Sequence, residues 1–168
     1  MMEQLINAYD FGLEYAKKLV EDIPECDVGR SGGKGLENSP LFSIGHLVTG
    51  AGLTAKSLGG SNSVDPSIRD AFERKGPNDQ RLAEESDHSF TMRELMDELS
   101  RQHEIVKSGI RDCSPADWEK PTQWRLGKYF PTLADATWFM CVTHETLHLG
   151  QIAAWRRWYG LPSAMAKL

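Results

Sequence analysis

The chain has 168 residues, of which 40% are hydrophobic and 26% charged, and its formal net charge is -5. These values predict one globular domain over residues 1–168 with a core of its own. The acidic balance, without any basic run, argues against nucleic-acid binding. No stretch approaches the roughly 18 apolar residues of a membrane span, and the acidic N-terminal segment is unlike a signal peptide.

The three cysteines bear on the cellular compartment. Cys26, Cys113 and Cys141 are odd in number and far apart in the chain. This pattern is typical of reduced thiols and not of a disulfide framework or a cysteine-based zinc site. It predicts a cytoplasmic protein.

The N-terminal part predicts two helices joined by a glycine-rich loop. Apolar residues at helical spacing predict a helix from about Glu3 to Glu21. Residues 22–37 contain four glycines and predict a loop. Ser39 suits the capping position and Pro40 the first helical position, and Gly59-Gly60 provides an end. A second helix is therefore expected between them.

A long connection, residues 61–90, separates the second helix from the third. One short helix is expected within it, from Asp65 or Pro66 to about Arg74. The segment Thr91-Met-Arg-Glu94 has the form of a capping box and predicts a helix that ends near Arg111. Ser114-Pro115 favours one further helical turn.

The last predicted helix follows a loop over residues 119–131. Thr132 provides its cap, Asp135 lies in its first turn, and Gly160 and Pro162 end it. No alternating strand pattern flanked by hairpin signals occurs. The fold class predicted is all-α, a four-helix bundle with a long connection between helices 2 and 3.

Two histidines in the last helix are the main functional signal. His144 and His148 are four residues apart, so they share one face of a helix and can reach one metal ion. They lie on a stripe expected to face inward, formed by Leu133, Thr137, Met140, Cys141, His144, His148, Gln151 and Trp155. The alternative is two core histidines whose ring nitrogens are satisfied by neighbouring polar groups.

His46, in the second helix, is the best candidate for a third ligand. Gly45, Gly50 and Gly52 surround it in the sequence and leave room for close helix approach or a cavity. Three nitrogen ligands leave positions open for water or substrate, as in catalytic metal sites. His103 continues an apolar stripe and is expected to be a satisfied core histidine, with a supporting or fourth-ligand role as the alternative. His88 lies beside Asp87 in a polar segment and is expected to be solvated.

The segment His144-Glu145-Thr-Leu-His148 also matches the H-E-x-x-H signature of zinc metalloproteases, in which Glu145 would be a general base. No histidine or glutamate follows His148 to complete the zincin set, and no sheet is predicted. Glu145 lies about 100° around the helix from His144. It is therefore expected to be exposed or to pair with Arg125 or Lys128.

Two segments resemble motifs of the DinB-like superfamily of metal-binding four-helix bundles. They are Ser39-Pro-Leu-Phe-Ser-Ile-Gly-His46-Leu and Thr143-His-Glu-Thr-Leu-His148-Leu-Gly-Gln151-Ile, followed by Gly160-Leu-Pro162. The resemblance implies that His46, His144 and His148 bind one divalent metal, either zinc, nickel or iron. Family members with known activity include S-transferases that use bacillithiol or mycothiol, and a mycothiol-dependent isomerase.

The leading hypothesis is a metal-dependent enzyme, a thiol-dependent S-transferase or a related hydrolase or isomerase. Its expected partners are a small-molecule substrate and a low-molecular-weight thiol. Gln151, one turn beyond His148, is a candidate to orient a ligand or the imidazole. The loop aromatics Trp124, Tyr129 and Phe130 either line the mouth of the site or close one end of the bundle.

The alternative hypothesis is a non-catalytic metal-binding or stress-associated protein that acts as a homodimer. The aromatic residues Trp155, Trp158 and Tyr159, next to Arg156 and Arg157, would suit a subunit interface, or would pack against the first helix. A structural site would be closed by a fourth protein ligand, with His103 the first candidate, whereas an enzyme needs an open metal face and a pocket.

Overall fold

Helices form the regular secondary structure of residues 2–74 and 89–168, the part of the chain that the computed structural model describes. The α-helices are α1 (Met2–Val20), α2 (Pro40–Ser57), α3 (Pro66–Phe72), α4 (Met92–Asp112), α5 (Pro115–Trp118), α6 (Leu133–Trp138) and α7 (Glu145–Tyr159). The π-helical segment η2 (Phe139–His144) joins α6 to α7, and two short 3-10 turns are η1 (Glu25–Asp27) and η3 (Ala164–Lys167). Isolated bridges, but no named strand, occur in the described loops. The all-α class is confirmed for these residues.

The helix boundaries follow the capping residues that the sequence predicted. Ser39 Oγ accepts a hydrogen bond from the Phe42 amide at 3.1 Å and so caps α2. Both halves of the capping box between Thr91 and Glu94 are formed at the start of α4. Gly160 ends α7 with φ at 92°, a conformation that glycine adopts without strain. The short helix α3 ends at Phe72, two residues before the predicted end.

The last helix differs from the prediction because it is not one α-helix. Buried positions Leu133, Thr137, Cys141, Glu145 and Leu149 are each four residues apart. Four α-helical residues turn through 400°, so this series would drift by about 40° at every step. The π-helical segment η2 has i→i+5 hydrogen bonds and more residues per turn, which keeps the series on one face.

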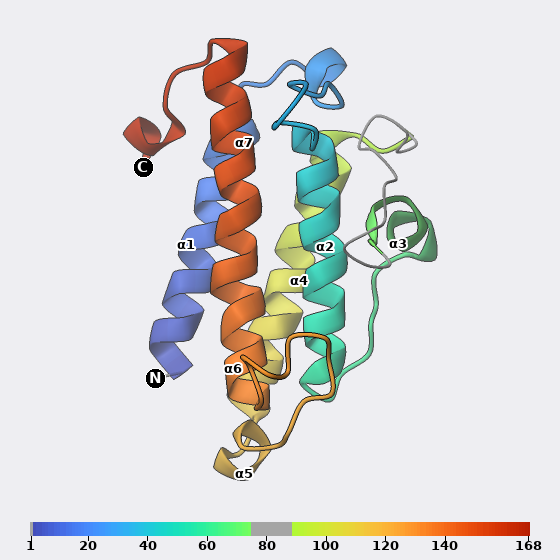
Figure 1. Cartoon of the computed structure of the whole chain (residues 1–168), viewed down its shortest axis with the longest axis vertical. Coiled ribbons are helices and arrows are strands. Elements are labelled where there is room, and N and C mark those ends of the chain that lie inside the picture. The colour runs from blue at the N-terminus through green and yellow to red at the C-terminus, as the bar shows by residue number, and fades with distance from the viewer. Residues whose placement is uncertain (1, 75–88) are drawn as a thin grey trace.

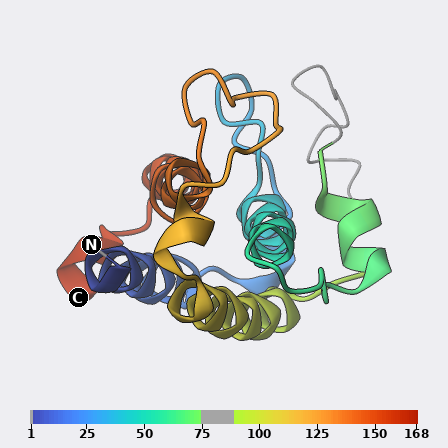
Figure 2. The same ribbon diagram turned by 90° about the horizontal axis from the view of Figure 1, so that it is seen from below.

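Helices α1, α2, α4 and α7 lie side by side in Figure 1. Helix α1 packs against α4 and α7, and α2 also packs against α4 and α7. Figure 2 shows the resulting two layers, with α2 and α7 on one side and α1 and α4 on the other. The loop over residues 119–131 lies on the α2 and α7 side, over the space between those helices. Helix α3 packs on α2 and flanks it.

The core consists of two apolar clusters, one toward each end of the long helices. On α4 the first cluster ends at Leu99 and the second begins at Val106, and on the last helix they are separated between Cys141 and Leu149. The buried side chains of His103 and Glu145 fall in that gap. A polar layer therefore crosses the middle of the fold.

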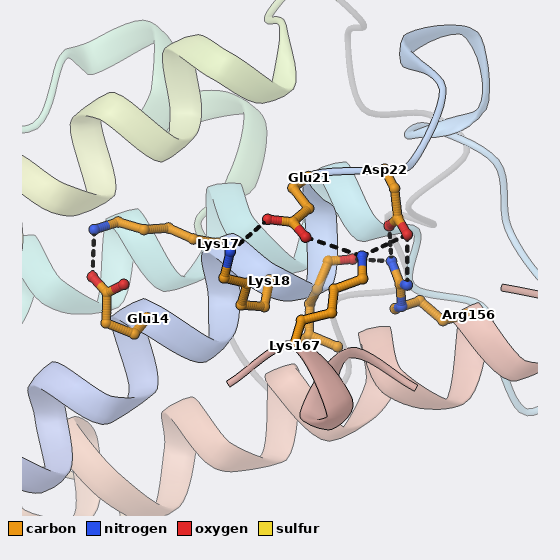
Figure 3. Close-up of polar contacts among 8 residues, drawn as sticks. Glu14, Lys17, Lys18, Glu21, Asp22, Arg156 and Lys167 are labelled. Atoms are coloured by element: carbon orange, nitrogen blue, oxygen red, sulfur yellow. Dashed lines mark hydrogen bonds and ion pairs between the residues drawn. The ribbon is translucent and has the colours of Figure 1, made fainter. Parts of the chain in front are cut away.

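A buried arginine fixes the upper end of α7 to the end of α1. The Arg156 guanidinium is 1% exposed and bonds to the Asp22 carboxylate, to the Leu19 carbonyl at 2.6 Å and to the Pro162 carbonyl at 3.0 Å. Lys167 reaches the same carboxylate at 2.6 Å (Figure 3). Arg156 holds the pKa of Asp22 well below its usual range.

This packing distinguishes among the residues considered for a subunit interface. Trp155 is fully buried and donates to the Arg30 carbonyl at 2.7 Å, and the Tyr159 hydroxyl bonds to Asp27. Trp155 and Arg156 are therefore used inside the chain and cannot meet a partner. Trp158, under the Arg30 guanidinium, keeps 44% of its surface exposed.

Candidate metal centre

Three histidines from distant parts of the chain meet between α2 and the last helix. His46 comes from α2, His144 ends η2 and His148 lies in α7. One ring nitrogen from each lies within 4.8 Å of the others, and the ring centroids are 4.7 to 5.3 Å apart. All three side chains are half-buried. Within the described residues, this is the group of potential ligands whose spacing suits one metal ion.

Hydrogen bonds fix the tautomers of two of these rings. His46 Nδ1 lies 3.0 Å from the carbonyl oxygen of Phe72, at the end of α3. Because a carbonyl only accepts, the proton is on Nδ1 and the Nε2 lone pair is free. His148 Nδ1 lies 3.0 Å from Gln151 Oε1, which is an acceptor too. Both rings therefore offer Nε2 to a shared ion, as ligating histidines with an outer hydrogen bond do.

The support of His148 extends through three further side chains. Gln151 Oε1 also accepts from Asn38 Nδ2 at 3.0 Å, and Asn38 Oδ1 accepts from Arg74 at 2.7 Å. The Arg74 guanidinium lies 4.6 Å from the centre of the Phe42 ring, which is stacked with His46. The predicted contact of Gln151 with the imidazole is present. Asn38 and Arg74 were not predicted, because loop residues remote in sequence leave no periodic signal.

Burial sets the protonation of the three rings. It lowers the pKa of His46, lowers that of His144 to about 4 and lowers that of His148 to about 3. Repulsion among the rings adds to the effect on His144 and His148, and the positive charges of Arg125 and Arg74 contribute further. At neutral pH the rings are uncharged, which is the state that binds a metal.

Glu145 is not where the sequence suggested. It is 4% exposed, and its carboxyl group points away from the histidine cluster to α1 and α4. The reason is Gly12 on α1, where even a Cβ atom would lie 2.1 Å from Glu145 Oε1. The expectation of exposure or of pairing with Arg125 or Lys128 was wrong. The helix is buried over a sector wide enough to include both the histidine face and a face 100° away.

His103 lies against Glu145 and not in the metal cluster. Its Nε2 atom is 3.2 Å from Glu145 Oε2, and its ring stacks on Tyr9 with centroids 3.6 Å apart. Burial raises the pKa of Glu145 to about 9 and lowers that of His103 to about 3. Burial thus disfavours the charged form of both groups. His103 is a buried core residue, as predicted, but neither of its ring nitrogens has a hydrogen-bond partner among the described residues, so the expectation of a satisfied histidine was wrong. A fourth-ligand role does not agree with its position beside Glu145.

Aromatic residues of the loop over residues 119–131 approach the centre through Phe139. Trp124 and Phe130 pack on the Phe139 ring at 5.4 and 4.7 Å, and that ring is 6.2 Å from His144. Tyr129 keeps 69% of its surface exposed and is not part of this group. His88 lies outside the described residues. Cys26, Cys113 and Cys141 are free, as predicted.

None of the helices in the described part combines the length and apolar character that a bilayer crossing requires. A search of curated proteins gave no match to the chain. The family model of the DinB superfamily, in contrast, matches residues 8–152. This range contains most of α1, all of α2 and α4, and all three clustered histidines, and it covers most of the sequence. The chain therefore belongs to the DinB superfamily.

Proposed function

We propose that this protein is a metal-dependent enzyme that binds one divalent ion, zinc, nickel or iron, through His46, His144 and His148. The observation that carries the proposal is the convergence of three neutral imidazoles, two of which have Nδ1 engaged and Nε2 free. A bound ion would add a +2 charge and keep coordination positions open. The packing of α1, α2, α4 and α7 supports the four-helix-bundle architecture.

The reaction class that suits this site best is thiol transfer to a small electrophilic molecule. Arg74 and Arg125 place positive charge near the histidines, as their effects on the ring pKa values indicate. Such surroundings favour an anionic thiolate over a neutral thiol. The thiolate sulfur would attack the electrophilic carbon, the bond to the leaving group would break, and the thiol proton would pass to solvent.

Two observations argue against the competing functions. A closed structural site needs a fourth ligand, and the candidate His103 faces Glu145 instead. Peptide hydrolysis of the zincin type needs Glu145 beside the metal, whereas its carboxyl group is packed against Gly12 and His103. We therefore expect no peptidase activity. Metal-dependent cleavage of an unstructured peptide that Glu145→Gln abolishes would contradict this assignment.

Metal content of the purified protein is the direct test of the site. His46→Ala, His144→Ala and His148→Ala should each strongly reduce bound metal, as measured by elemental analysis. Leu147→Ala is a matched control, because Leu147 lies in the same helix and is 59% exposed. Full occupancy in His144→Ala would rule out the three-histidine site.

Thiol transfer is tested on the metal-loaded protein. Low-molecular-weight thiols are offered with 1-chloro-2,4-dinitrobenzene, and thioether formation is followed by absorbance. The proposal expects turnover that is lost in His148→Ala and retained in Glu145→Gln. A metal-loaded protein that shows no transfer with any thiol would leave the metal site in place but contradict the reaction class.

A further inference from the structure

A cavity lies beside Met140, four residues before His144 in the chain, and has no part in the proposed metal binding. It is about 460 Å³ in volume, within the range of ligand pockets. Its walls include Leu53 and Thr54 of α2, Ala136 and Met140 of the last helix, and Trp124 of the covering loop. We call this cavity the tail groove. Its lining is mainly apolar, and no described side chain fills it.

The tail groove continues the helix faces that carry the histidines. On α2, Gly50, Leu53 and Thr54 follow His46 by four, seven and eight residues. On the last helix, Met140 and Ala136 precede His144 by four and eight residues. Because these two helices run in opposite directions (Figure 1), both series lead from the histidines toward the same end of the molecule. The groove therefore lies farther along the two helices that carry the histidines.

Met140 lies at the boundary of the groove, near His144. A Cβ atom on Gly50 would lie 3.2 Å from Met140 Cε and 3.3 Å from His144 Cε1, so both side chains rest against the bare backbone of Gly50. Methionine is unbranched and has three rotatable bonds, so it can change rotamer at little cost. Trp124 forms a wall of the groove and also contacts Phe139, the neighbour of His144. Met140 therefore contributes an adaptable side chain to this boundary.

The groove wall also holds a polar group without a partner. Thr137 lines the groove and is 2% exposed, and among the described residues its Oγ1 atom has no hydrogen-bond partner. Buried polar atoms are normally paired, by protein, water or ligand.

We propose that the tail groove binds the apolar part of the substrate, an alkyl or aryl substituent, while its polar reactive end lies at the three histidines. This inference rests on the proposed metal site and names the substrate class of that site. Seven to eight helical residues separate His46 from the Leu53 and Thr54 wall, or about 11 Å along the axis. An extended alkyl chain of about eight carbons spans that distance.

Alkyl hydroxamic acids test the proposal, because the hydroxamate binds a metal and the tail length can be varied. Zinc-loaded protein is titrated by calorimetry with the series from acetohydroxamic to octanohydroxamic acid. Affinity should rise about threefold for each added methylene group. Ala136→Phe should fill the groove and flatten this rise while leaving acetohydroxamate affinity and zinc content unchanged. Ala166→Phe, at an exposed position, is the matched control.

A second variant guards against misfolding of the first. Leu53 lines the groove but is 42% exposed, so Leu53→Glu is expected to fold and to reduce the gain from tail length. Normal acetohydroxamate binding without any gain along the series would overturn the tail groove and leave the metal site intact. No zinc-dependent binding of acetohydroxamate would contradict the proposed function instead.

If acetohydroxamate shows no zinc-dependent binding, the tail groove can still be tested with the metal-free protein. Octanohydroxamic acid should shift the methyl NMR signal of Met140, and Ala136→Phe should abolish the shift. An unchanged Met140 signal at saturating ligand would overturn the inference independently of any metal.

Discussion

Two of the histidine rings at the metal centre are held in orientation by hydrogen bonds at Nδ1, the ring nitrogen that faces away from the proposed metal. The Phe72 carbonyl fixes the His46 ring and Gln151 fixes the His148 ring, so each Nε2 lone pair points to the shared space. His144 has neighbours of another kind, Met140 and the Gly50 backbone. The three rings are therefore oriented by α3, by α7 and by close helix packing respectively.

Gln151 is expected to act on metal affinity through His148. Gln151→Leu removes the acceptor for Nδ1 but keeps the size of the side chain, so the ring can rotate or change tautomer. Loss of such an outer partner typically costs about 10- to 100-fold in metal affinity. Competition with a chromophoric chelator measures this, with Gln4→Leu, at an exposed position, as the control. Equal affinities of Gln151→Leu and wild type would show that the hydrogen bond has no such role.

Metal binding should persist to lower pH than ordinary histidines allow. The pKa of His144 is lowered to about 4, that of His148 to about 3, and that of His46 is lowered too, so protons compete with the metal at lower pH than at ordinary histidines. Affinity should therefore show no midpoint of loss near pH 6.5 and should fall only at lower pH. The metal-free fold behaves differently: the unfolded histidines bind protons from about pH 6.5 downward. Its stability therefore falls as pH drops from there toward the folded pKa values.

Both quantities can be measured on the same samples. Affinity comes from chelator competition at each pH, and circular dichroism shows over which range the protein stays folded. A midpoint of metal loss near pH 6.5 in folded protein would contradict the lowered pKa values.

At the scale of elements, the junction between α6 and α7 decides which side chains meet the metal. The π-helical segment ends at His144, so Glu145 turns into the core while His144 and His148 stay at the surface of the interhelical space. Gly12 on α1 makes room for the Glu145 carboxyl group, and His103 on α4 faces it. The π-helical segment thus directs Glu145 into the polar layer of the core and the two histidines to the metal centre.

Two glycine substitutions separate close packing from helix propensity. Gly12→Ala puts a Cβ atom against Glu145 Oε1 and should destabilise the fold by about 1–3 kcal/mol. Gly150→Ala is the matched control, because nothing lies within 4 Å of that position and alanine favours helix. It should be neutral or stabilise by up to about 1 kcal/mol. Urea unfolding gives both values, and equal effects would show that Gly12 is not a packing site.

Local features of these elements could be predicted from the sequence, whereas some contacts between distant segments could not. Ser39, Thr91 and Thr132 placed three helix starts correctly, because caps act locally. The three histidines were found because helical spacing puts His144 and His148 on one face. The position of Glu145 was missed, since it depends on Gly12, more than 130 residues away. Asn38 and Arg74 were missed too, because loop conformation brings them to Gln151.

For the whole molecule, a metal ion at this site would join two long segments that the chain connects only distantly. His46 lies in α2, whereas His144 and His148 lie almost a hundred residues later. Between them run the connection to α4, α4 itself and the loop over residues 119–131. The apolar clusters and the Arg156 contacts hold the same helices together without any metal. Metal binding should therefore add stability to a fold that already forms.

The stability that a bound metal adds follows from mass action, so its magnitude can be predicted. A ligand that binds only the folded state at 100 times its Kd stabilises by about 2.7 kcal/mol. For a chain of this length, about 1 kcal/mol corresponds to 2–4 °C in Tm, so zinc should raise Tm by about 5–10 °C. A chelator should reverse the rise, and His148→Ala should show almost none of it. Calorimetric unfolding with and without zinc measures the effect, and Leu147→Ala should retain it. If zinc raised the Tm of a variant lacking all three histidines by the same amount, the stabilising ion would lie elsewhere, because a folded-state shift can come only from a site that the folded chain builds.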